Sequence, residues 1–357
     1  MSDIADWIRL AKLEQPKKAV ALVDYFGTPE AVFQAKDRDL MEINGITAKT
    51  AEKLRAVAAA SVDAELRAVE KQEIRIVTYW DDEYPQNLRQ IFDPPAVLFV
   101  KGCFKESDRF AVAVIGTRVP SEYGKSMTAK LSRDLAKRGL CVVSGAARGI
   151  DTVAHTAAVQ AEGRTLAVLG SGVDVPYPYE NRGLLKRIAE YGAVISEFVP
   201  GTKPDAWRFP IRNRLVSGLS LGVLVVESKM SGGAMITATI AGEQGRDVWA
   251  IPGGTDSTTS EGPHRLIKEG AKLVDNVDDI LNDLGIEAQT EERKSPPTNL
   301  TPEQNTILQL LNLHPKHVDE IIQECRLSAA VTNSTLTLLE MLGLVRRVPG
   351  NAYVRSV

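Results

Sequence analysis

The sequence predicts a doubly wound α/β core, preceded by a small helical module and followed by a winged helix. Short apolar runs typical of buried strands recur after residue 110, at 111–115, 140–143, 165–169, 193–195, 221–226 and 247–251. Stretches with helical periodicity separate most of these runs. Strands that alternate with helices need crossover connections, which give a mostly parallel sheet covered on both faces. The length of 357 residues exceeds one typical core, so further domains are expected.

Residues 1–70 are expected to form the helical module. Ala, Leu, Glu, Lys and Arg dominate this segment, and turn signals at 26–29 and 43–46 separate its helices. The part from 40 to 54 resembles a helix-hairpin-helix, whose turn amides can hold a phosphate, but Thr47 stands where that motif usually has a second glycine. Ten basic residues face twelve acidic ones, which favours a packing module over a DNA reader.

The core domain is expected over residues 71–285. Its first part, 71–110, contains proline-rich stretches at 84–85 and 93–95, which predict an extended lead-in rather than a helix. Ligands of doubly wound domains bind beyond the carboxyl ends of the strands. Candidate site residues should therefore lie in the loops that follow the apolar runs.

The C-terminal part is expected to hold a linker at 286–299, which is polar and ends in Pro-Pro, and a winged helix at 300–357. The predicted elements of the winged helix are a helix start at 301–304, helices near 317–325 and 328–342, and a hairpin at 344–354. Its candidate recognition helix, 329–342, contains no Lys or Arg. Reading the major groove normally needs such residues, so a protein-interaction or accessory role is favoured.

Composition limits the functional classes. No apolar run reaches the roughly 18 residues that a membrane helix needs, and the N-terminus lacks the basic start and apolar centre of a signal peptide. The three cysteines are far apart and odd in number, so we expect reduced thiols in a cytoplasmic protein and no metal site. The net charge of the chain is −3, so a nucleic-acid binding site would have to be a local cluster of cations on one face.

Cations recur in the loops expected at one edge of the sheet. Arg118 follows the first apolar run, two residues after Gly116, and Arg148 follows the second run and Gly145. The glycines let the backbone approach a ligand, and the helix after each loop presents free N–H groups, so the pattern favours an anion site. The Gly-Lys-Ser at 124–126 is not a P-loop, because seven residues instead of four separate the glycines. No cofactor is expected.

The densest cluster of cations lies between residues 203 and 214. It holds one acid, and Trp207 and Phe209 lie within it; its cations are Lys203, Arg208, Arg212 and Arg214. A strongly apolar run at 219–226 follows, so these arginines are expected on the approach loop of a buried strand. Cations interleaved with rings suit a flexible single strand, whose exposed bases can stack there.

Two further loops leave alternatives open. The loop at 228–238, with Ser231 and Gly232, fits a backbone anion cradle or a tight turn required by packing equally well. Tyr177 and Tyr179 follow another Gly-x-Gly and are expected either to stack on bases or to pack as buried rings.

These motifs, in this order, resemble the DNA-processing protein A (DprA, also called Smf) family over essentially residues 1–357. The resemblance is densest between 112 and 271, and its motifs include Gly116-Thr117-Arg118, Val143-Ser144-Gly145, Ala147-Arg148-Gly149-Ile150-Asp151, Phe209-Pro210-Ile211-Arg212-Asn213-Arg214, Ser231-Gly232 and Ile251-Pro252-Gly253. It implies a Rossmann-like core and a non-enzymatic binder that protects incoming single-stranded DNA and loads RecA during natural transformation. It also implies a homodimer formed through the core.

The resemblance maps the basic pocket of the family onto Arg118 and, with fewer matching motifs, onto Arg148, Arg212 and Arg214. Arg182 lies near a DNA-contact position of the family. Together with the loop analysis, the predicted DNA-binding set is Arg118, Arg148, Arg182, Arg208, Arg212, Arg214, Gly116, Gly145, Ser231 and Gly232.

An enzyme is the competing interpretation. The core also resembles the cytokinin-activating phosphoribohydrolases, which carry a Pro-Gly-Gly-x-Gly-Thr loop followed by an acid. Here 252–256 lacks the third glycine, although Glu261 or Glu197 could polarise a water molecule. A hydrolytic triad is disfavoured because no Gly-x-Ser-x-Gly elbow surrounds its serine; the members would be Ser144, Asp151 and His155. A transcription regulator would rest on the winged helix alone, whose neutral recognition helix weakens it.

Overall fold

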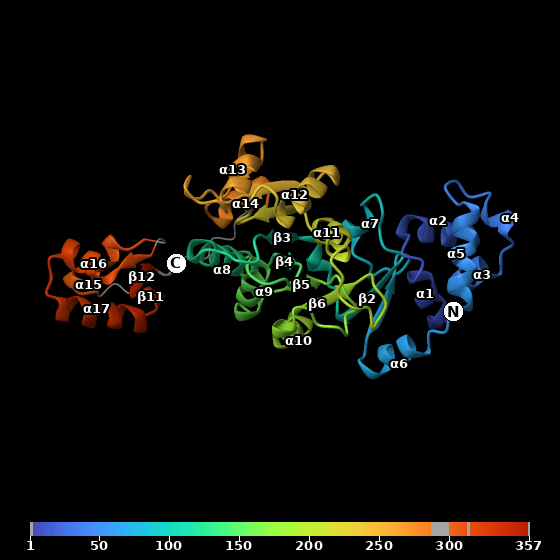
Figure 1. Cartoon of the computed structure of the whole chain (residues 1–357), viewed down its shortest axis with the longest axis horizontal. Coiled ribbons are helices and arrows are strands. Elements are labelled where there is room, and N and C mark those ends of the chain that lie inside the picture. The colour runs from blue at the N-terminus through green and yellow to red at the C-terminus, as the bar shows by residue number, and fades with distance from the viewer. Residues whose placement is uncertain (1–2, 287–299, 313–314, 356–357) are drawn as a thin grey trace.

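The structure is a computed structural model that describes residues 3–286, 300–312 and 315–355. Helices of the N-terminal module lie at one end of the molecule, the large sheet occupies the middle, and the C-terminal domain lies at the other end (Figure 1). All but the first residue of the linker predicted at 286–299 lies outside the described residues. None of the described helices has both the length and the apolar character that crossing a bilayer requires.

The N-terminal module is helical, as predicted. Its helices are α1 (Ile4–Ala11), α2 (Pro16–Phe26), α3 (Pro29–Gln34), α4 (Asp37–Leu40), α5 (Ala48–Ala59) and α6 (Asp63–Lys71). Local sequence signals define several ends: the side chains of Asp3 and Thr28 cap α1 and α3, and Gly27 ends α2 with a φ of 84°. Ile8 and Leu54 of this module are fully buried, and they belong to a hydrophobic cluster that also contains residues of the large sheet domain.

The core contains one sheet with strand order β1-β2-β6-β5-β4-β3-β7-β8-β9. The strands are β1 (Arg75–Thr78), β2 (Val97–Gly102), β3 (Ala111–Ile115), β4 (Cys141–Ser144), β5 (Thr165–Val168), β6 (Ala193–Ser196), β7 (Gly222–Val225), β8 (Asp247–Ala250) and β9 (Lys272–Leu273). From β6 to β9 every neighbouring pair is parallel. The predicted mostly parallel α/β sheet is therefore confirmed.

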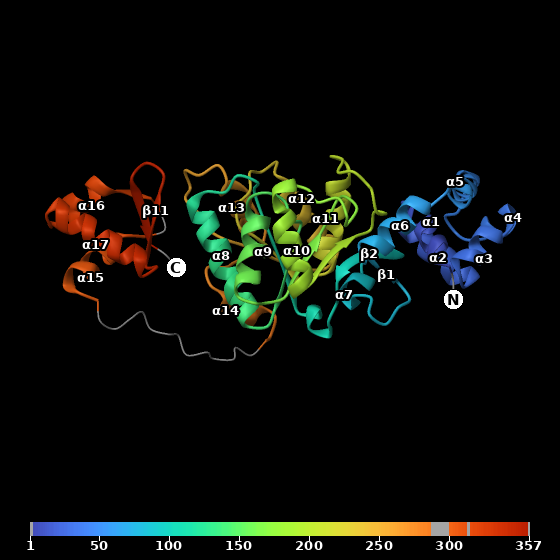
Figure 2. The same ribbon diagram turned by 90° about the horizontal axis from the view of Figure 1, so that it is seen from below.

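Helices cover both faces of this sheet. On one face α8 (Glu122–Lys137), α9 (Ile150–Gln160) and α10 (Arg182–Tyr191) run side by side (Figure 2). The other face carries α11 (Arg208–Gly218) and α12 (Gly233–Glu243). The remaining helical segments of the core are α7 (Gln86–Arg89), η1 (Glu106–Arg109), η2 (Tyr179–Asn181), α13 (Glu261–Lys268) and α14 (Val277–Asp283). Side chains of β3 alternate between the two faces, as the pleat requires.

Two stretches differ from the sequence-based expectation. Residues 71–110 form more than an extended lead-in, because β1 and β2 pair antiparallel with each other and β2 pairs antiparallel with β6. The cationic stretch from 208 to 218 is a helix, not an approach loop. Pro210 lies in the first turn of that helix, where no backbone N–H has an intrahelical partner, so proline is tolerated.

The chain reverses its direction of growth through the sheet at β3. Strands β4, β5 and β6 are added on one side of β3, and β7, β8 and β9 on the other. A crevice forms beyond the carboxyl ends of the strands at such a topological switch point. The loops after β3, β4 and β7 meet there.

The C-terminal domain is a winged helix, as predicted. Its elements are α15 (Pro302–Leu310), β10 (Lys316–His317), α16 (Val318–Cys325), α17 (Ala329–Met341), β11 (Val345–Val348) and β12 (Ala352–Arg355). The strands pair antiparallel in the order β10-β12-β11, and Ile321, Leu336 and Leu339 form part of the small core. In the wing, Arg346 lies 2.7 Å from a carboxylate oxygen of Glu122 at the start of α8.

Candidate nucleic-acid interface

A cavity of about 690 Å³ lies at the switch point, and we call it the switch-point groove. It is bounded by the loops after β3, β4 and β7, by one side of α11 and by the first turn of α12. Four residues predicted from the sequence as backbone or loop contacts line it: Gly116, Gly145, Ser231 and Gly232. The sequence therefore located the edge of the sheet at which the groove forms.

Arg118 is the predicted arginine that reaches into the groove in an exposed position. Its guanidinium carbon lies 5.7 Å from the ring centre of Phe209, and no ion pair links it to a carboxylate among the described residues. Gly116 sets the path of this loop, because a Cβ there would lie 2.9 Å from the carbonyl oxygen of Glu227. The backbone N–H of Thr117 donates to that same oxygen at 2.7 Å, which fixes the loop against the end of β7.

Glu227 does not line the groove, but its carboxylate is hydrogen-bonded to the loop beside the groove. Its Oε2 accepts from the backbone N–H of Ser121 at 2.9 Å, and its Oε1 accepts from the hydroxyl of Ser121 at 2.5 Å. Ser121 is the N-cap of α8, so Glu227 holds the start of that helix in place. No group of His, Cys, Asp and Glu side chains suited to a metal ion occurs within the described ranges.

Arg212 forms the floor of the groove and is only 4% exposed. Its guanidinium donates to the carbonyl oxygen of Gly145 at 2.7 Å and to that of Val168. Burial lowers the pKa of Arg212 to about 10, against the favourable field of Asp151. Arg212 therefore stays charged at neutral pH. Its Nη1 donates to the protein backbone, whereas its buried Nε has no hydrogen-bond partner among the described residues.

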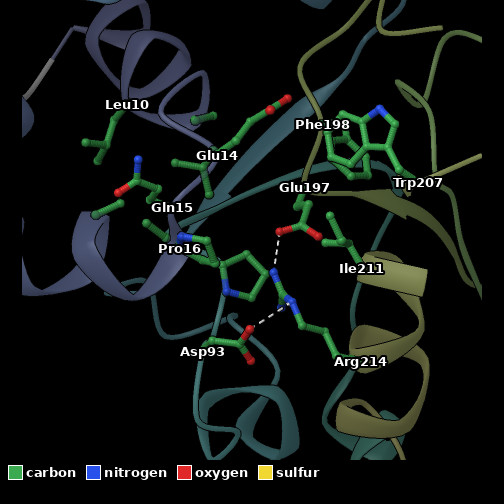
Figure 3. A pocket seen from close by; sticks show the side chains of 15 residues that line it. Leu10, Glu14, Gln15, Pro16, Asp93, Glu197, Phe198, Trp207, Ile211 and Arg214 are labelled. Carbon is green, nitrogen blue, oxygen red and sulfur yellow. Dashed lines mark hydrogen bonds and ion pairs between the residues drawn. The ribbon is translucent and has the colours of Figure 1, made fainter. Parts of the chain in front are cut away.

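Arg214 and Arg208 point away from the groove, contrary to the expectation that the arginines converge. Arg214 lies 3.2 Å from Asp93 and also pairs with Glu197 (Figure 3). Arg208 lies 3.5 Å from Glu14. Because 208–218 is a helix, Arg214, two residues after Arg212, points to the opposite side of it, whereas Arg208, in the first turn, is drawn to Glu14 of the N-terminal module.

Arg148 and Arg182 lie on the surface but do not line the groove. Arg148 is exposed and pairs with Glu180, and this bond lowers the pKa of the Glu180 carboxyl and raises the pKa of Arg148. Arg182 begins α10 and donates to the hydroxyl of Tyr179 at 3.4 Å. Both arginines lie outside the cluster around Arg118.

Lys229 is a groove residue that the sequence-based set omits. It is exposed, lines the groove after β7, and has no ion-pair partner among the described residues. Tyr177 also lines the groove, and its ring centre lies 5.5 Å from that of Phe209. The available signal was the loop itself, since Lys229 stands two residues before the predicted Ser231-Gly232 pair.

The groups proposed for hydrolytic chemistry are occupied elsewhere. The hydroxyl of Ser144 donates to the carbonyl of Val114 at 2.7 Å, and Nδ1 of His155 lies 2.7 Å from the hydroxyl of Thr165. Burial lowers the pKa of His155 to about 3, so this imidazole is neutral at neutral pH. Glu197 lines a different cavity from the groove.

Known protein families match all three parts of the chain. The family model described as DNA recombination-mediator protein A matches residues 75–285, the DprA winged helix domain matches 291–351, and a SAM-like helix-hairpin-helix tandem matches 15–60. The chain is 32% identical to Protein Smf from Synechocystis, over 99% of both proteins. It is 46% identical to the DNA processing protein DprA from Streptococcus pneumoniae, over 56% of this chain and 71% of that protein.

Two solved structures are also similar. The X-ray structure of DNA processing protein A from Streptococcus pneumoniae matches with a TM-score of 0.67 and 37% identity, covering 81% of this chain and 100% of that one. DNA processing protein A from Helicobacter pylori, described for its single-stranded DNA binding mode, matches with a TM-score of 0.53 and 30% identity. That match covers 59% of this chain and 95% of the relative.

Proposed function

The chain belongs to the DNA recombination-mediator protein A (DprA/Smf) family, and from this premise we propose that it binds single-stranded DNA in the switch-point groove. The family is one of DNA processing proteins. The observation that carries the proposal is the position of Arg118, which is exposed, unpaired with any carboxylate of the described residues and placed over Phe209 inside the groove. A guanidinium in that position is available to a phosphate.

The proposed binding mode separates phosphate contacts from base contacts. Arg118 and Lys229 neutralise phosphates from two sides of the groove, and the first turn of α12 adds backbone N–H groups after Gly232. Tyr177 and Phe209 offer rings on which bases stack. Aromatic side chains can stack only on bases whose faces are exposed, so this mode favours a single strand over a duplex. The related protein from Helicobacter pylori, which binds single-stranded DNA, supports this choice.

Arg148, Arg182, Arg208 and Arg214 are assigned lesser roles than the sequence suggested. Arg148 and Arg182 lie on the surface outside the groove and are proposed as secondary contacts for a longer strand. Arg208 and Arg214 are held by carboxylates on another side of α11, and Arg212 is proposed to act through its charge and by shaping the floor.

The test is a salt titration of binding, measured by fluorescence anisotropy with a single strand and a duplex of the same sequence. We expect Arg118→Ala to weaken single-strand binding about tenfold and to flatten the log–log salt dependence by about 0.7. Arg118→Lys should keep the slope. Arg67→Ala, an exposed arginine of α6, is the matched control and should behave like the wild type. Tighter binding of the duplex, or an unchanged slope in Arg118→Ala, would overturn the proposal.

We further propose that the bound strand is handed to RecA during natural transformation, and that the protein acts as a homodimer through its core. The family description as a recombination mediator supports the first part. The three cysteines are unpaired, which fits the proposed location in the cytoplasm. ATP hydrolysis by RecA on single strands coated with single-strand-binding protein should speed up when this protein is added. Light scattering after gel filtration should give twice the mass of the chain, and a monomer would remove the dimer from the proposal.

The proposed activity is binding and not catalysis. Ser144 and His155 are fully buried and each is hydrogen-bonded within the protein, and Glu197 is paired with Arg214. Incubation with nucleoside monophosphates should release no free base. Release of base that depends on Glu261 would instead favour the phosphoribohydrolase-like alternative.

A further inference from the structure

The chain leads directly from a residue of the switch-point groove into helix α10. Tyr177 lines the groove, η2 begins two residues later, and α10 follows η2 without a break. Asn181 fixes the start of α10, because its Nδ2 donates to the carbonyl oxygen of Ala146 at 2.9 Å and to the hydroxyl of Thr152 at 2.8 Å. Ala146 belongs to the loop after β4, between two residues that line the groove. The first turn of α10 is therefore held at the edge of the groove.

Aromatic rings continue from the groove to this helix. Phe209 and Tyr177 lie in the groove, with ring centres 5.5 Å apart. Tyr179 does not line the groove, and it is 70% exposed. Its hydroxyl accepts from Arg182 at 3.4 Å, so this ring lies between the groove and the first cation of α10. A base stacked on Tyr179 would cover apolar surface that faces water in the free protein.

The exposed side of α10 carries three cations that no carboxylate neutralises. Arg182, Lys186 and Arg187 are exposed, and none of them has an ion pair within the part of the chain that the structure describes. Arg182 and Lys186 are four residues apart, so they lie one turn apart on the same side of the helix. Four helical residues rise about 6 Å. This separation is close to that of neighbouring phosphates in an extended single strand.

The other helices that border the groove offer no such row of cations among the described residues. Neither α9 nor α12 contains Lys or Arg, and Arg148, just before α9, is held by a carboxylate. On α11, Arg208 and Arg214 are also paired with carboxylates. The first cation of α8, Lys125, is paired with Glu122. Unpaired cations next to the groove therefore continue in a row along α10.

We propose that a single strand longer than the groove leaves it over Tyr179 and continues along α10, with its phosphates on Arg182, Lys186 and Arg187. We call these four residues the α10 track. The proposal rests on single-strand binding in the groove, and it adds Tyr179, Lys186 and Arg187 to the DNA-binding residues. The ligand is a flexible strand, because a duplex offers no base face to Tyr179. Glu190, in the last turn of α10, repels phosphates and ends the track.

The experiment compares thymine strands of two lengths in salt titrations followed by fluorescence anisotropy. A strand of about 6 nucleotides is meant to occupy the groove alone, and one of about 18 nucleotides exceeds the roughly 4–16 nucleotides that single-strand sites commonly take. The longer strand should have a log–log salt slope steeper by about 1.4–2.1, because two or three further phosphates are neutralised at about 0.7 each. The slope is compared because extra binding registers on a longer strand raise its affinity without changing its slope.

A double variant connects this difference to α10. Lys186→Ala/Arg187→Ala changes two exposed residues of a helix to alanine, which helices favour, so the fold should be unaffected. It should flatten the slope of the longer strand by about 1.4 and leave the shorter strand unchanged. Lys130→Ala/Lys137→Ala removes the same charge from α8, and α9 lies between α8 and α10 (Figure 2). This control should keep both slopes.

Tyr179 is tested separately, because a ring contributes affinity without changing the number of neutralised phosphates. Tyr179→Ala should weaken binding of the longer strand about fivefold to tenfold and leave its salt slope unchanged. Tyr179→Phe keeps the ring and should bind like the wild type. An equal loss in Tyr179→Phe would show that the hydroxyl, and not stacking, is responsible, and would remove Tyr179 from the track.

The outcomes separate the two proposals. Equal slopes for the two lengths in the wild type overturn the track and leave the groove proposal intact. An unchanged slope in Lys186→Ala/Arg187→Ala also overturns the track, as does an equal flattening in the α8 control. If Lys186→Ala/Arg187→Ala weakens RecA stimulation but not strand binding, α10 serves a protein partner and the track fails. If neither strand binds, both proposals fail.

Discussion

The switch-point groove and the winged helix both belong to folds that often bind nucleic acid, but they present opposite surfaces. The groove exposes Arg118 and Lys229 without carboxylate partners among the described residues. The recognition helix of the winged helix, α17, has no Lys or Arg, and its exposed residues include Val331 and Leu338. In the wing, Arg346 is paired with Glu122. Fold alone therefore does not assign binding, and our proposal rests on the placement of free cations.

The largest expected effect concerns the floor of the groove. Arg212→Met should lower the free energy of unfolding by about 2–5 kcal/mol, because the buried carbonyl oxygens of Gly145 and Val168 lose the donor that they share. Urea denaturation followed by circular dichroism measures this change. Arg118→Met, at the exposed end of the same groove, is the matched control and should be near neutral. Equal stability of the two variants would mean that the buried guanidinium of Arg212 contributes no more to folding than the exposed guanidinium of Arg118.

The next effect compares cations of the groove with cations of the wing. The double variant Arg118→Ala/Lys229→Ala should lose about 30-fold to 100-fold in affinity for a single strand, because two phosphate contacts disappear. Arg346→Ala/Arg347→Ala removes the same charge from the wing and should stay within about twofold of the wild type, since one of these arginines is already paired. Anisotropy at a fixed salt concentration gives both values. A similar loss of affinity in the two double variants would contradict the proposed difference between the groove and the wing.

A smaller effect concerns pH and the buried core beneath the groove. The folded pKa of His155, about 3, is below its unfolded value of 6.5, so the unfolded chain binds the proton first as pH falls. The stability that neutral His155 supports is present above pH 6.5 and is lost below it, by at most about 1.4 kcal/mol per pH unit. Asp151, whose pKa burial raises, acts in the opposite direction. The comparison is therefore made against His155→Asn.

Urea denaturation at pH 7.5 and pH 5.5 provides the measurement. The wild type should lose more stability over this interval than His155→Asn, because Asp151 contributes equally to both proteins. The imidazole protons of His155 in the wild type should also show no titration between pH 5 and 8 in nuclear magnetic resonance spectra. A normal titration midpoint would show that the core is more open to water than its burial indicates.

The smallest effect concerns the contact between the two regions. Glu122→Gln removes the ion pair to Arg346, which is half exposed, so the free energy of unfolding should change by less than about 1 kcal/mol. Affinity for a single strand should also stay unchanged. A several-fold gain in affinity would mean that the wing restricts entry to the groove, and the two regions would then have to be treated as one site.

The sequence predicted most of the architecture, although not β1, β2 and α11, because the signals for most elements are local. Apolar runs, helical periodicity and glycine-containing loops placed the sheet, the helices and the edge where Gly116 and Gly145 meet. The ion-pair partner of each arginine, in contrast, does not depend on the local sequence. Arg214 is neutralised by Asp93 and Glu197, which come from other parts of the chain, and nothing in the stretch around Arg214 announces them. The loop expected around these arginines was inferred from the apolar run at 219–226, whereas 208–218 forms a helix whose first turn accepts Pro210.

Lys229 illustrates the opposite failure. Lys229 lies in a loop that was predicted as a candidate anion site, but a single lysine among small residues gave little reason to add it to the predicted set. Its importance comes from the strand order, which brings the end of β7 next to the end of β3. The pairing of those strands becomes visible only in three dimensions.

The ion pairs of Arg214 also bear on how the molecule comes apart. Arg214, Asp93 and Glu197 lie in the core, but the turn at Glu14 and Gln15 closes over them from the N-terminal module. Detachment of that module would bring water to the buried charges and to Phe198. Melting of the N-terminal helices should consequently lower the stability of the core domain. Heating should then unfold the N-terminal module and the core domain in one transition instead of two separate steps.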